Sequence, residues 1–459
     1  MTTEAVRLAV VAGHRRTEAA VVRPDGHPIA AVEFASTGSA VADVDAALTQ
    51  LLDRHPAETA AARAVVVACG WSAAALHRLH DLNPVLAVRL AATPRSAVPP
   101  LNGWPSALRT AVSAGEVVVS GGCGVDGSAP VPLDRAGLRA ALARLGPSAS
   151  AVAVTGTFAG VSPDDERAAE RIAETELPGR PVVLSHDFGV LGLLERENAA
   201  ILNAALTGVG RAVTDALVAA LAEHGLTAPC YVVRNDGTLM LAEHAARFPV
   251  LTYAGPEAAW LRGGAVLAGL DDALVCRAEH TEVTIGVAHA GRPRVAPGRR
   301  MLAGVPTTVG LPHLATVRRT ARGADAVRAG SRSHLSRTIE RMRDGGAPEQ
   351  VVLVGAAGEL PGVAEVLRPR QARFAAAVGA ALAPVGATAE TILPRSMPAD
   401  RRRDLLVERA VELAVRHGAD LGAIYVAELT ELPLPYLPDS PVHARARVEG
   451  PPQLRARPS

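Results

Sequence analysis

Hydrophobic positions along the chain form short apolar runs that alternate with stretches of helical spacing. Near the N-terminus, runs at 6–11, 17–22 and 29–34 are separated by short turns, which predicts a β-meander. The next stretch, 41–54, carries apolar residues at helical spacing. Because strand and helix patterns keep alternating afterwards, the sequence predicts an α/β fold.

Further elements are predicted on the same criteria: strands at 64–68, 85–90, 151–155, 182–185, 231–233, 273–276, 281–287, 351–354 and 424–432, and helices at 133–145, 163–177, 195–224, 243–247, 258–270, 374–382 and 400–417. We expect the long helix at 195–224 to break near Gly208 or Gly210, and Asp400 to cap the last helix. The Arg- and Pro-rich chain after Pro441 is expected to be frayed.

Composition narrows the class of protein. The 459 residues are 49% hydrophobic, which suffices for a large core and suggests two to three domains. Because 47 basic residues balance 46 acidic ones, no overall field favours nucleic acid or an anionic membrane as partner. Every basic residue is arginine, so no lysine is present to form a Schiff base or bind phosphate as a point charge.

Cysteine usage and segment lengths indicate a reduced, soluble protein. Cys69, Cys123, Cys230 and Cys276 lie too far apart for a C-x-x-C site, so we expect buried reduced thiols and no metal site. The apolar run at 8–12 is too short for a signal peptide. No uninterrupted apolar run reaches the ~18 residues of a membrane span. We therefore expect a cytoplasmic protein.

Several segments together resemble the hydantoinase/oxoprolinase family. The most specific is Leu184-Ser185-His186-Asp187 with the run LLERENAAILNA at 193–204. Asn235-Asp236-Gly237-Thr238-Leu239-Met240 follows, and Ala254-Gly255-Pro256 is similar to that family's Ser-Gly-Pro turn. With weaker matches elsewhere, the resemblance extends from about residue 6 to about residue 450, and it is closest to hydantoinase A-like subunits.

The resemblance implies an actin-like fold, with two RNase-H-like lobes and an interlobe cleft, in a chain shortened relative to the family. It implies an N-terminal-like region at 1–183, a hydantoinase A-like region at 184–395, a C-terminal helix and strand at 396–440, and a disordered tail at 441–459. By family habit, ATP and Mg²⁺ are the cofactors, cyclic amides the substrates, and a hydantoinase B-like subunit or a second copy the partner.

The phosphate-binding hairpins depart from the family pattern. The first, roughly Asp-x-Gly-Gly-Thr-x-Thr-Asp, corresponds to residues 11–18, where Gly13 and Thr17 survive and Glu18 replaces the final Asp. Val11 and His14 replace the leading Asp and the second Gly. Glycine is needed there because backbone N–H groups must approach phosphate closely.

The second hairpin, at 277–284, loses both glycines, and Arg277 replaces its metal-side Asp, with Thr281 retained in the turn. At ~4 Å and an effective dielectric near 20, the lost attraction of an Asp to Mg²⁺ and the new repulsion of Mg²⁺ by Arg277 are each worth roughly 4 kcal/mol. Arg15, Arg16 and Arg277 remain candidates for holding an anion directly, without metal. The polar groups of two further family elements are also missing, at 68–75 and 316–321.

The other candidate polar residues each have a functional and a structural interpretation. Gly355 and Gly358 form either an adenosine cradle or a common strand-to-helix turn. Asn235, Asp236, Gly237 and Thr238 form either a substrate-facing loop or an Asx turn, and Gly255 either offers N–H groups to a ligand or simply begins a helix. We expect the charged runs at 186–187 and 195–197 to be a structural ion-pair network, Asn203 to be a buried helix residue, and His14 and His280 to be solvated.

Two hypotheses follow. In the first, the chain is a catalytically degenerate homologue that acts as a binding or complex subunit. In the second, it is an active ATP-dependent hydrolase that opens cyclic amides of the hydantoin or 5-oxoproline type, or a carboxylase-type subunit. Residue chemistry favours the first.

Overall fold

The protein is described by a computed structural model that covers residues 5–93, 98–128, 131–296, 300–318, 326–355, 360, 363–437 and 439–454, without the side chains of 326–333. Within that range, mixed sheets alternate with helices along the whole chain. The predicted α/β class and the predicted two-lobe, actin-like fold are both confirmed.

The first lobe is built on the predicted meander. Strands β1 (Arg7–Ala12), β2 (Arg16–Val22) and β3 (Pro28–Ala35) pair antiparallel, and β4 (Val65–Cys69) and β9 (Cys230–Val233) then add parallel to β1, giving the order β3-β2-β1-β4-β9. Both faces of β1 are buried: Leu8 and Val10 pack toward α1 (Ala40–Arg54), whereas Ala9 and Val11 face the second lobe. This explains why β1 reads as a continuous apolar run.

The second lobe repeats this topology. Its strands are β11 (Ala273–Ala278), β12 (Glu282–His289), β16 (Leu314–Arg318), β17 (Val351–Val354) and β18 (Val366–Leu367). β11 pairs antiparallel with β12, β12 pairs antiparallel with β16, and β17 and β18 add parallel beyond β11. The resulting order, β16-β12-β11-β17-β18, is the 3-2-1-4-5 order of the first lobe.

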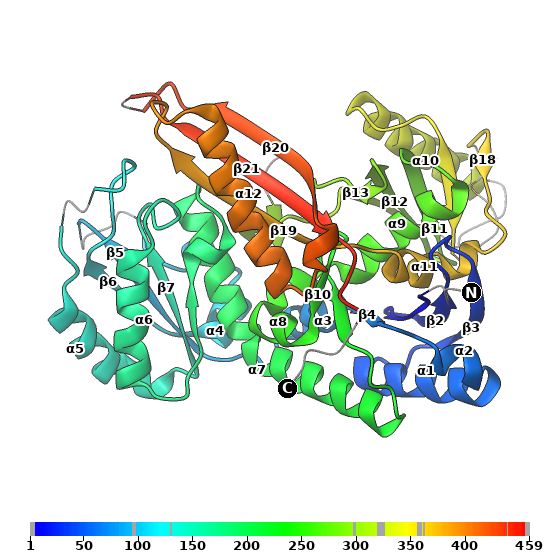
Figure 1. Cartoon of the computed structure of the whole chain (residues 1–459), viewed down its shortest axis with the longest axis horizontal. Helices are drawn as coiled ribbons and strands as arrows, with labels where there is room; N and C mark the ends of the chain where they lie inside the picture. The colour runs from blue at the N-terminus through cyan, green and yellow to red at the C-terminus, as the bar shows by residue number, and fades with distance from the viewer. Residues whose placement is uncertain are drawn as a thin grey trace.

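A C-terminal unit extends the first sheet. β10 (Leu239–Leu241), β19 (Val385–Leu393), β21 (Val442–Gly450) and β20 (Tyr425–Pro433) bring the sheet to nine strands among the described residues, and α12 (Ala399–Arg416) packs on β19 and β21 (Figure 1). The prediction of a frayed tail after Pro441 is wrong for β21, because Ala444, Ala446 and Val448 alternate into the core. Residues 455–459 lie outside the described part of the chain.

The segment between β4 and β9 forms a separate parallel sheet. Its order is β6 (Ser113–Ser120), β5 (Val85–Ala91), β7 (Ala151–Gly156) and β8 (Val182–Leu184), at the left of Figure 1. Helices α5 (Arg135–Leu145) and α6 (Asp164–Glu176) pack on one face, and α4 (Ser106–Val112) and α7 (Leu193–Glu223) on the other.

Helix α7 runs without interruption from 193 to 223, so the predicted break at Gly208 or Gly210 is wrong. Both glycines serve close packing instead, since a Cβ on Gly208 would press on the Asn83 side chain and one on Gly210 would crowd Trp71. By length and apolar composition α7 would pass for a membrane span. Half of that stretch is buried within the protein, however, as in a core helix.

Besides the helix α10 (Ala326–Asp344), the remaining elements are short: α2 (Pro56–Ala60), α3 (Trp71–Arg78), α8 (Ala242–Arg247), the strands β13 (Arg292–Pro293), β14 (Arg300–Leu302) and β15 (Val305–Thr307), and the 3-10 turns η1 (Gly146–Ser148), η2 (Ser185–Phe188), η3 (Pro249–Thr252), η4 (Ala372–Phe374) and η5 (Leu421–Ala423). Pro398, not Asp400, stands at the N-cap of α12. Asp400 lies within the first turn, where its charge still complements the helix dipole.

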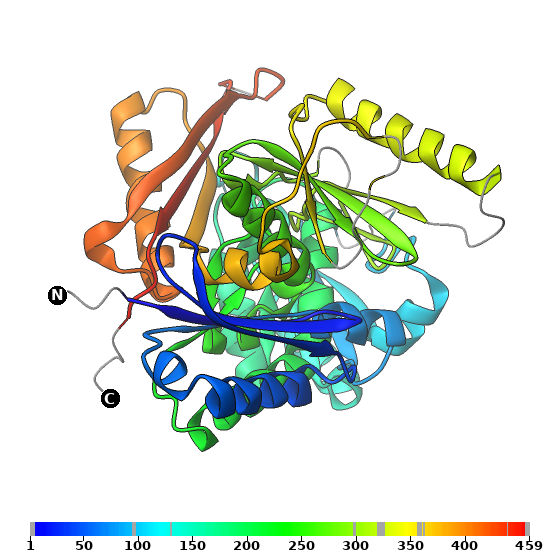
Figure 2. The same cartoon turned by 90° about the vertical axis from the view of Figure 1, so that its right-hand side faces the viewer.

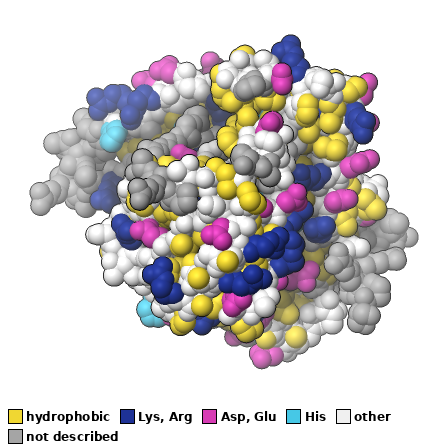
Figure 3. Space-filling model, turned by 90° about the vertical axis from the view of Figure 1, so that its left-hand side faces the viewer, with side chains coloured by type: hydrophobic (Ala, Val, Ile, Leu, Met, Phe, Trp, Pro, Cys, Tyr) yellow, Lys and Arg dark blue, Asp and Glu magenta, His cyan; other side chains and the backbone are white. Residues whose placement is uncertain are grey.

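On the face drawn in Figure 3, arginine and acidic side chains are interspersed.

Two helices lie between the lobes and join them. α9 (Gly255–Ala268) follows the first lobe and α11 (Ala375–Ala381) follows the second, and in Figure 2 α11 sits between the blue strands of the first lobe and the green strands of the second. The helices cross backbone to backbone. A Cβ on Gly263 would overlap the carbonyl oxygen of Ala375, and one on Gly379 would overlap that of Ala259. Glycine is therefore required at this crossing.

We expect Gly263→Ala to destabilise the protein by about 2–3 kcal/mol, because the added methyl must push the two helix backbones apart. Urea unfolding followed by circular dichroism measures this loss. Gly422→Ala is the matched control, since Gly422 is exposed and its added Cβ would make only an ordinary contact. Equal stability of the two variants would contradict the close crossing.

Candidate functional site

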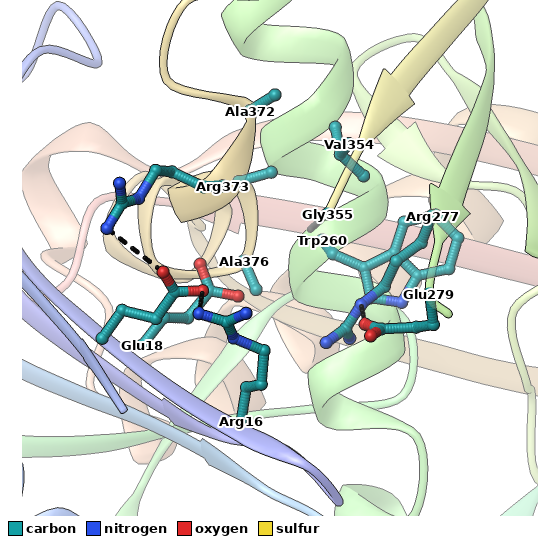
Figure 4. A pocket seen from close by; sticks show the side chains of 12 residues that line it. Arg16, Glu18, Trp260, Arg277, Glu279, Val354, Gly355, Ala372, Arg373 and Ala376 are labelled. Carbon is teal, nitrogen blue, oxygen red and sulfur yellow. Dashed lines mark hydrogen bonds and ion pairs between the residues drawn. The ribbon is translucent and has the colours of Figure 1, made fainter. Parts of the chain in front are cut away.

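The two family-like hairpins face each other across one small cavity between the lobes. The cavity is lined by residues from β2, β3, α9, β11, β17, η4 and α11: Arg16, Glu18, Glu33, Trp260, Arg277, Glu279, Val354, Gly355, Ala372, Arg373, Ala375 and Ala376 (Figure 4). Its volume is about 10 Å³, which is room for about one water molecule. The structure thus brings together four predicted residues: Arg16, Glu18, Arg277 and Gly355.

Glu18 is the buried carboxyl group of this cavity. It lies opposite Val11 in the β1–β2 ladder, and its Oε2 accepts a 3.4 Å hydrogen bond from the N–H of Ala377 in the first turn of α11. Burial raises the pKa of Glu18 to about 7, although Arg277 and the backbone N–H groups of α11 oppose that rise. A carboxyl group from one lobe therefore caps the helix that follows the other.

Arginine–glutamate pairs occupy the rest of the cavity. Arg16 contacts Glu33 at 2.5 Å, and Arg373 contacts the other oxygen of Glu33 at 3.2 Å. Arg277 donates from Nε to Glu279 at 3.1 Å (Figure 4). Three guanidinium groups thus face three carboxyl groups, and their charges balance once Glu18 is ionised, above about pH 7.

Backbone geometry narrows the space further. A Cβ added to Gly13 would lie 3.8 Å from Nη2 of Arg277, so this guanidinium reaches from the second hairpin to the turn of the first. Gly355 has a φ of +93°, and a Cβ there would lie 2.9 Å from the carbonyl oxygen of Ala278. Gly355 therefore packs against β11, which accounts for the glycine without any ligand.

These residues do not fit a magnesium-bound triphosphate. Arg277 stands where the family pattern has a carboxylate, and Glu279 is already paired to it. Among the described residues, no group of three or more His, Cys, Asp or Glu side chains is arranged to hold a metal ion. Nor does the geometry favour direct anion binding by Arg15, Arg16 and Arg277, since Arg16 and Arg277 are paired and Arg15 is exposed outside the cavity.

Other predicted cleft residues lie elsewhere. Thr17 is buried on the opposite side of β2 from Glu18 and shares a 2.8 Å hydrogen bond with Ser36. Thr281 is exposed in the β11–β12 turn and does not line the cavity. Gly358 lies outside the described residues, and so do 319–321 of the fourth family element.

The Asn235–Thr238 turn and Gly255 make close contacts within the protein. The Asn235 amide is buried, donating to the Val250 carbonyl and accepting from the Ala254 N–H. The Asp236 carboxylate accepts from the N–H and hydroxyl of Thr238, forming an Asx turn. Gly237 has a φ of +78° and lies close to Pro293. A Cβ on Gly255 would lie 2.6 Å from the Val233 carbonyl oxygen.

Asp236 also belongs to a charged network. Burial alone would raise the pKa of Asp236, but Arg234, Arg447 and Thr238 outweigh it and hold the pKa well below its usual range. The turn thus anchors β9 and β10 to β21. This is the structural interpretation of the motif.

The expected structural ion-pair network is confirmed. His186 Nδ1 lies 2.6 Å from Glu166 Oε2, and Arg196 donates to the Ser185 hydroxyl at 2.6 Å. Glu197 pairs with buried Arg89. Asn203 bridges the backbones of Arg247 and Val250 from within α7, as expected. His14 and His280 are both exposed, and all four cysteines are buried and free.

Sequence reasoning missed Glu33, Trp260 and Arg373 in the cavity. Glu33 is a polar residue on a strand and Arg373 precedes a helix, so neither stands in a recognisable motif. The one available signal for Trp260 was its place on the apolar helix that follows Gly255-Pro256.

Comparison with known proteins supports this architecture. The sequence model of the hydantoinase/oxoprolinase N-terminal region matches residues 7–177. Acetone carboxylase in its nucleotide-free form is similar with a TM-score of 0.69 and 14% identity, over 99% of this chain and 90% of that one. The ATP-dependent caprolactamase from Pseudomonas jessenii is similar with a TM-score of 0.72 and 15% identity, over 98% and 88%. A search of curated proteins finds no match.

The fold and the paired hairpins therefore define a two-lobe protein of the actin-like class. Residues 7–177 are therefore similar to the hydantoinase/oxoprolinase N-terminal region, and the whole chain shares its fold with acetone carboxylase and the caprolactamase.

The raised pKa of Glu18 predicts a pH-dependent stability. Because the folded pKa, about 7, exceeds the ordinary value of 4.5, the folded state holds this proton more tightly than the unfolded chain. Ionisation between pH 4.5 and pH 7 therefore lowers the free energy of unfolding, by about 3 kcal/mol in full. Glu18→Gln should be more stable than the wild type at pH 8 and equal to it near pH 4.

Urea unfolding at both pH values measures this difference. Glu408→Gln is the control, because Glu408 is exposed on α12 and should change stability little at either pH. A stability gap between Glu18→Gln and wild type that stays constant with pH would show that Glu18 does not titrate in this range.

Proposed function

We propose that this protein is a catalytically degenerate member of the hydantoinase/oxoprolinase family that serves as a binding or complex subunit rather than an ATP-hydrolysing one. The observation that carries this proposal is the interlobe cavity of about 10 Å³, filled by its own arginine–glutamate pairs. A nucleotide-dependent relative needs glycine-lined backbone and carboxylates at these positions.

Charge supports the same conclusion. In this chain Arg277 replaces the metal-side carboxylate expected in the second hairpin, and buried Val11 replaces the one expected in the first. The remaining acid, Glu18, bonds the N-terminus of α11 and holds its proton up to about pH 7. Mg²⁺ prefers several ionised oxygen ligands in octahedral geometry, which this set does not offer.

The second candidate is an active ATP-dependent enzyme of the cyclic amide or carboxylase type. It is favoured by the whole-chain likeness in fold to acetone carboxylase and to an ATP-dependent caprolactamase. For this candidate, the Arg277–Glu279 and Arg16–Glu33 pairs would have to open to admit a nucleotide.

Nucleotide binding distinguishes the two candidates. A ligand that binds the native state raises the melting temperature. Because we expect no nucleotide to bind, millimolar ATP with Mg²⁺ should leave the melting temperature unchanged and release no phosphate above a protein-free blank. ATP with EDTA is the control for non-specific effects. A Mg²⁺-dependent rise in melting temperature with steady phosphate release would establish the second candidate.

A subunit role requires a surface for another chain, and β20 offers one. It is the edge strand of the nine-stranded sheet and exposes large apolar side chains. Tyr425 is 55% exposed, Leu432 59% and the following Tyr436 74%. Exposed apolar edge strands pair readily with other strands. We propose a two-fold assembly of two copies through β20, because antiparallel pairing makes an edge self-complementary.

Light scattering after size-exclusion chromatography tests this assembly. We expect a mass near twice 47.2 kDa for the wild type and a mass near 47.2 kDa for Leu432→Glu, which places a charge on the paired edge. Val218→Glu is the control, since Val218 is 50% exposed on α7, away from β20. A monomeric wild type would rule out the second copy and favour a hydantoinase B-like subunit at this edge.

A further inference from the structure

A second cavity lies on the far side of α9 from the interlobe cavity. It has a volume of about 420 Å³, against about 10 Å³ for the cavity between the hairpins. Its polar walls are Arg262 from α9, Arg292 from β13, Tyr425 from β20 and Glu449 from β21, and its apolar floor includes Leu382 and Pro384 after α11. The cavity shares Tyr425 of β20 with the edge proposed above for the assembly, whereas its other polar walls have no part in that proposal.

Arg262 is the unusual group in this cavity. Its exposed fraction is 8%, and its Nε and Nη2 have no hydrogen-bond partner within the part of the chain that the structure describes. Burial lowers the pKa of Arg262 to about 10, which still leaves it charged at neutral pH, and Glu449 only partly opposes that shift. Burying a charge without a partner costs folding free energy, so buried charges in proteins are normally paired.

The nearest carboxylate, Glu449, is engaged elsewhere. Its Oε1 accepts from Arg447 at 2.9 Å and from Arg292 at 3.2 Å, and its Oε2 accepts from the Tyr425 hydroxyl at 3.2 Å. Arg447 also lies 3.8 Å from Asp236, which Arg234 approaches at 3.9 Å. Counting Glu428, which also interacts with Arg447, four guanidinium groups (Arg234, Arg262, Arg292 and Arg447) share three carboxylates, which leaves an excess of one positive charge.

We propose that this cavity binds a small molecule through a single carboxylate group, held by Arg262 and Arg292 with its apolar part against Leu382 and Pro384. A guanidinium and a carboxylate match each other in shape and charge, and the volume suits a small ligand. Glu449 in the wall disfavours a doubly charged group, so a monocarboxylate fits better than phosphate. This proposal does not depend on whether ATP binds in the interlobe cavity.

Thermal shift titrations with sodium butyrate, at constant ionic strength set with sodium chloride, test the proposal. We expect a saturable rise in melting temperature with butyrate. Butyramide, which has the same shape without the charge, and inorganic phosphate should produce no saturable rise. Isothermal titration calorimetry then gives the dissociation constant.

Variants separate binding from folding. Arg262→Met should abolish the response to butyrate, and without ligand it should melt no lower than the wild type, because it removes an unpartnered buried charge. Arg292→Met should weaken butyrate binding at least tenfold. Arg409→Met, an exposed arginine on α12, is the matched control and should respond as the wild type does.

The proposal is overturned by a wild type that shows no saturable response to butyrate, by phosphate or butyramide acting equally well, or by a butyrate response that persists in Arg262→Met. If Arg262→Met melts far below the wild type, its lost response to butyrate reports on folding rather than on binding. In that case Arg292→Met, which alters a partly exposed arginine, still measures whether butyrate binds here.

Discussion

The backbone-to-backbone crossing of α9 and α11 is the contact on which both cavities depend. Gly263 and Gly379 let the two helices approach more closely than any side chain allows. This approach fixes Trp260, Ala375 and Ala376 beside the hairpins and directs Arg262 to the opposite side of α9. Each helix follows one lobe, so the crossing also sets how closely the two lobes meet.

Given that approach, the charges at the hairpins determine what the cleft holds. In an open, glycine-lined cleft, the backbone would be free to meet phosphate. Here the guanidinium of Arg277 extends to the turn at Gly13, and Glu18 bonds the first turn of α11. The same interlobe geometry is therefore held together by ion pairs within the protein.

Local patterns predicted most of the fold, and they missed what depends on distant contacts. Apolar runs identified β1, β4 and β17 because those strands are buried on both faces. β21 was missed because its arginines resemble a solvated tail, whereas Arg447 is buried against Glu449 in the folded sheet. The glycines of α7 looked like helix breaks, yet they accommodate Asn83 and Trp71, which lie far away in the sequence.

The candidate site shows the same division. The hairpin residues Arg16, Glu18 and Arg277 were found from motif positions and do lie together. Their partners Glu33 and Arg373 were not found, because only the folded chain brings them to the cavity. Asn235 and Gly255 stood in a polar, glycine-rich motif, but the sequence could not show that Asn235 bonds the backbone of Val250 or that Gly255 packs against Val233.

We infer that arginine–glutamate pairs occupy the place that a magnesium nucleotide would take. A crystal structure grown with millimolar Mg·ATP tests it most directly. The account predicts electron density for the Arg277–Glu279 pair between the hairpins and no nucleotide there. Density for a triphosphate and its metal between Gly13 and Gly355, with Arg277 displaced, would contradict it.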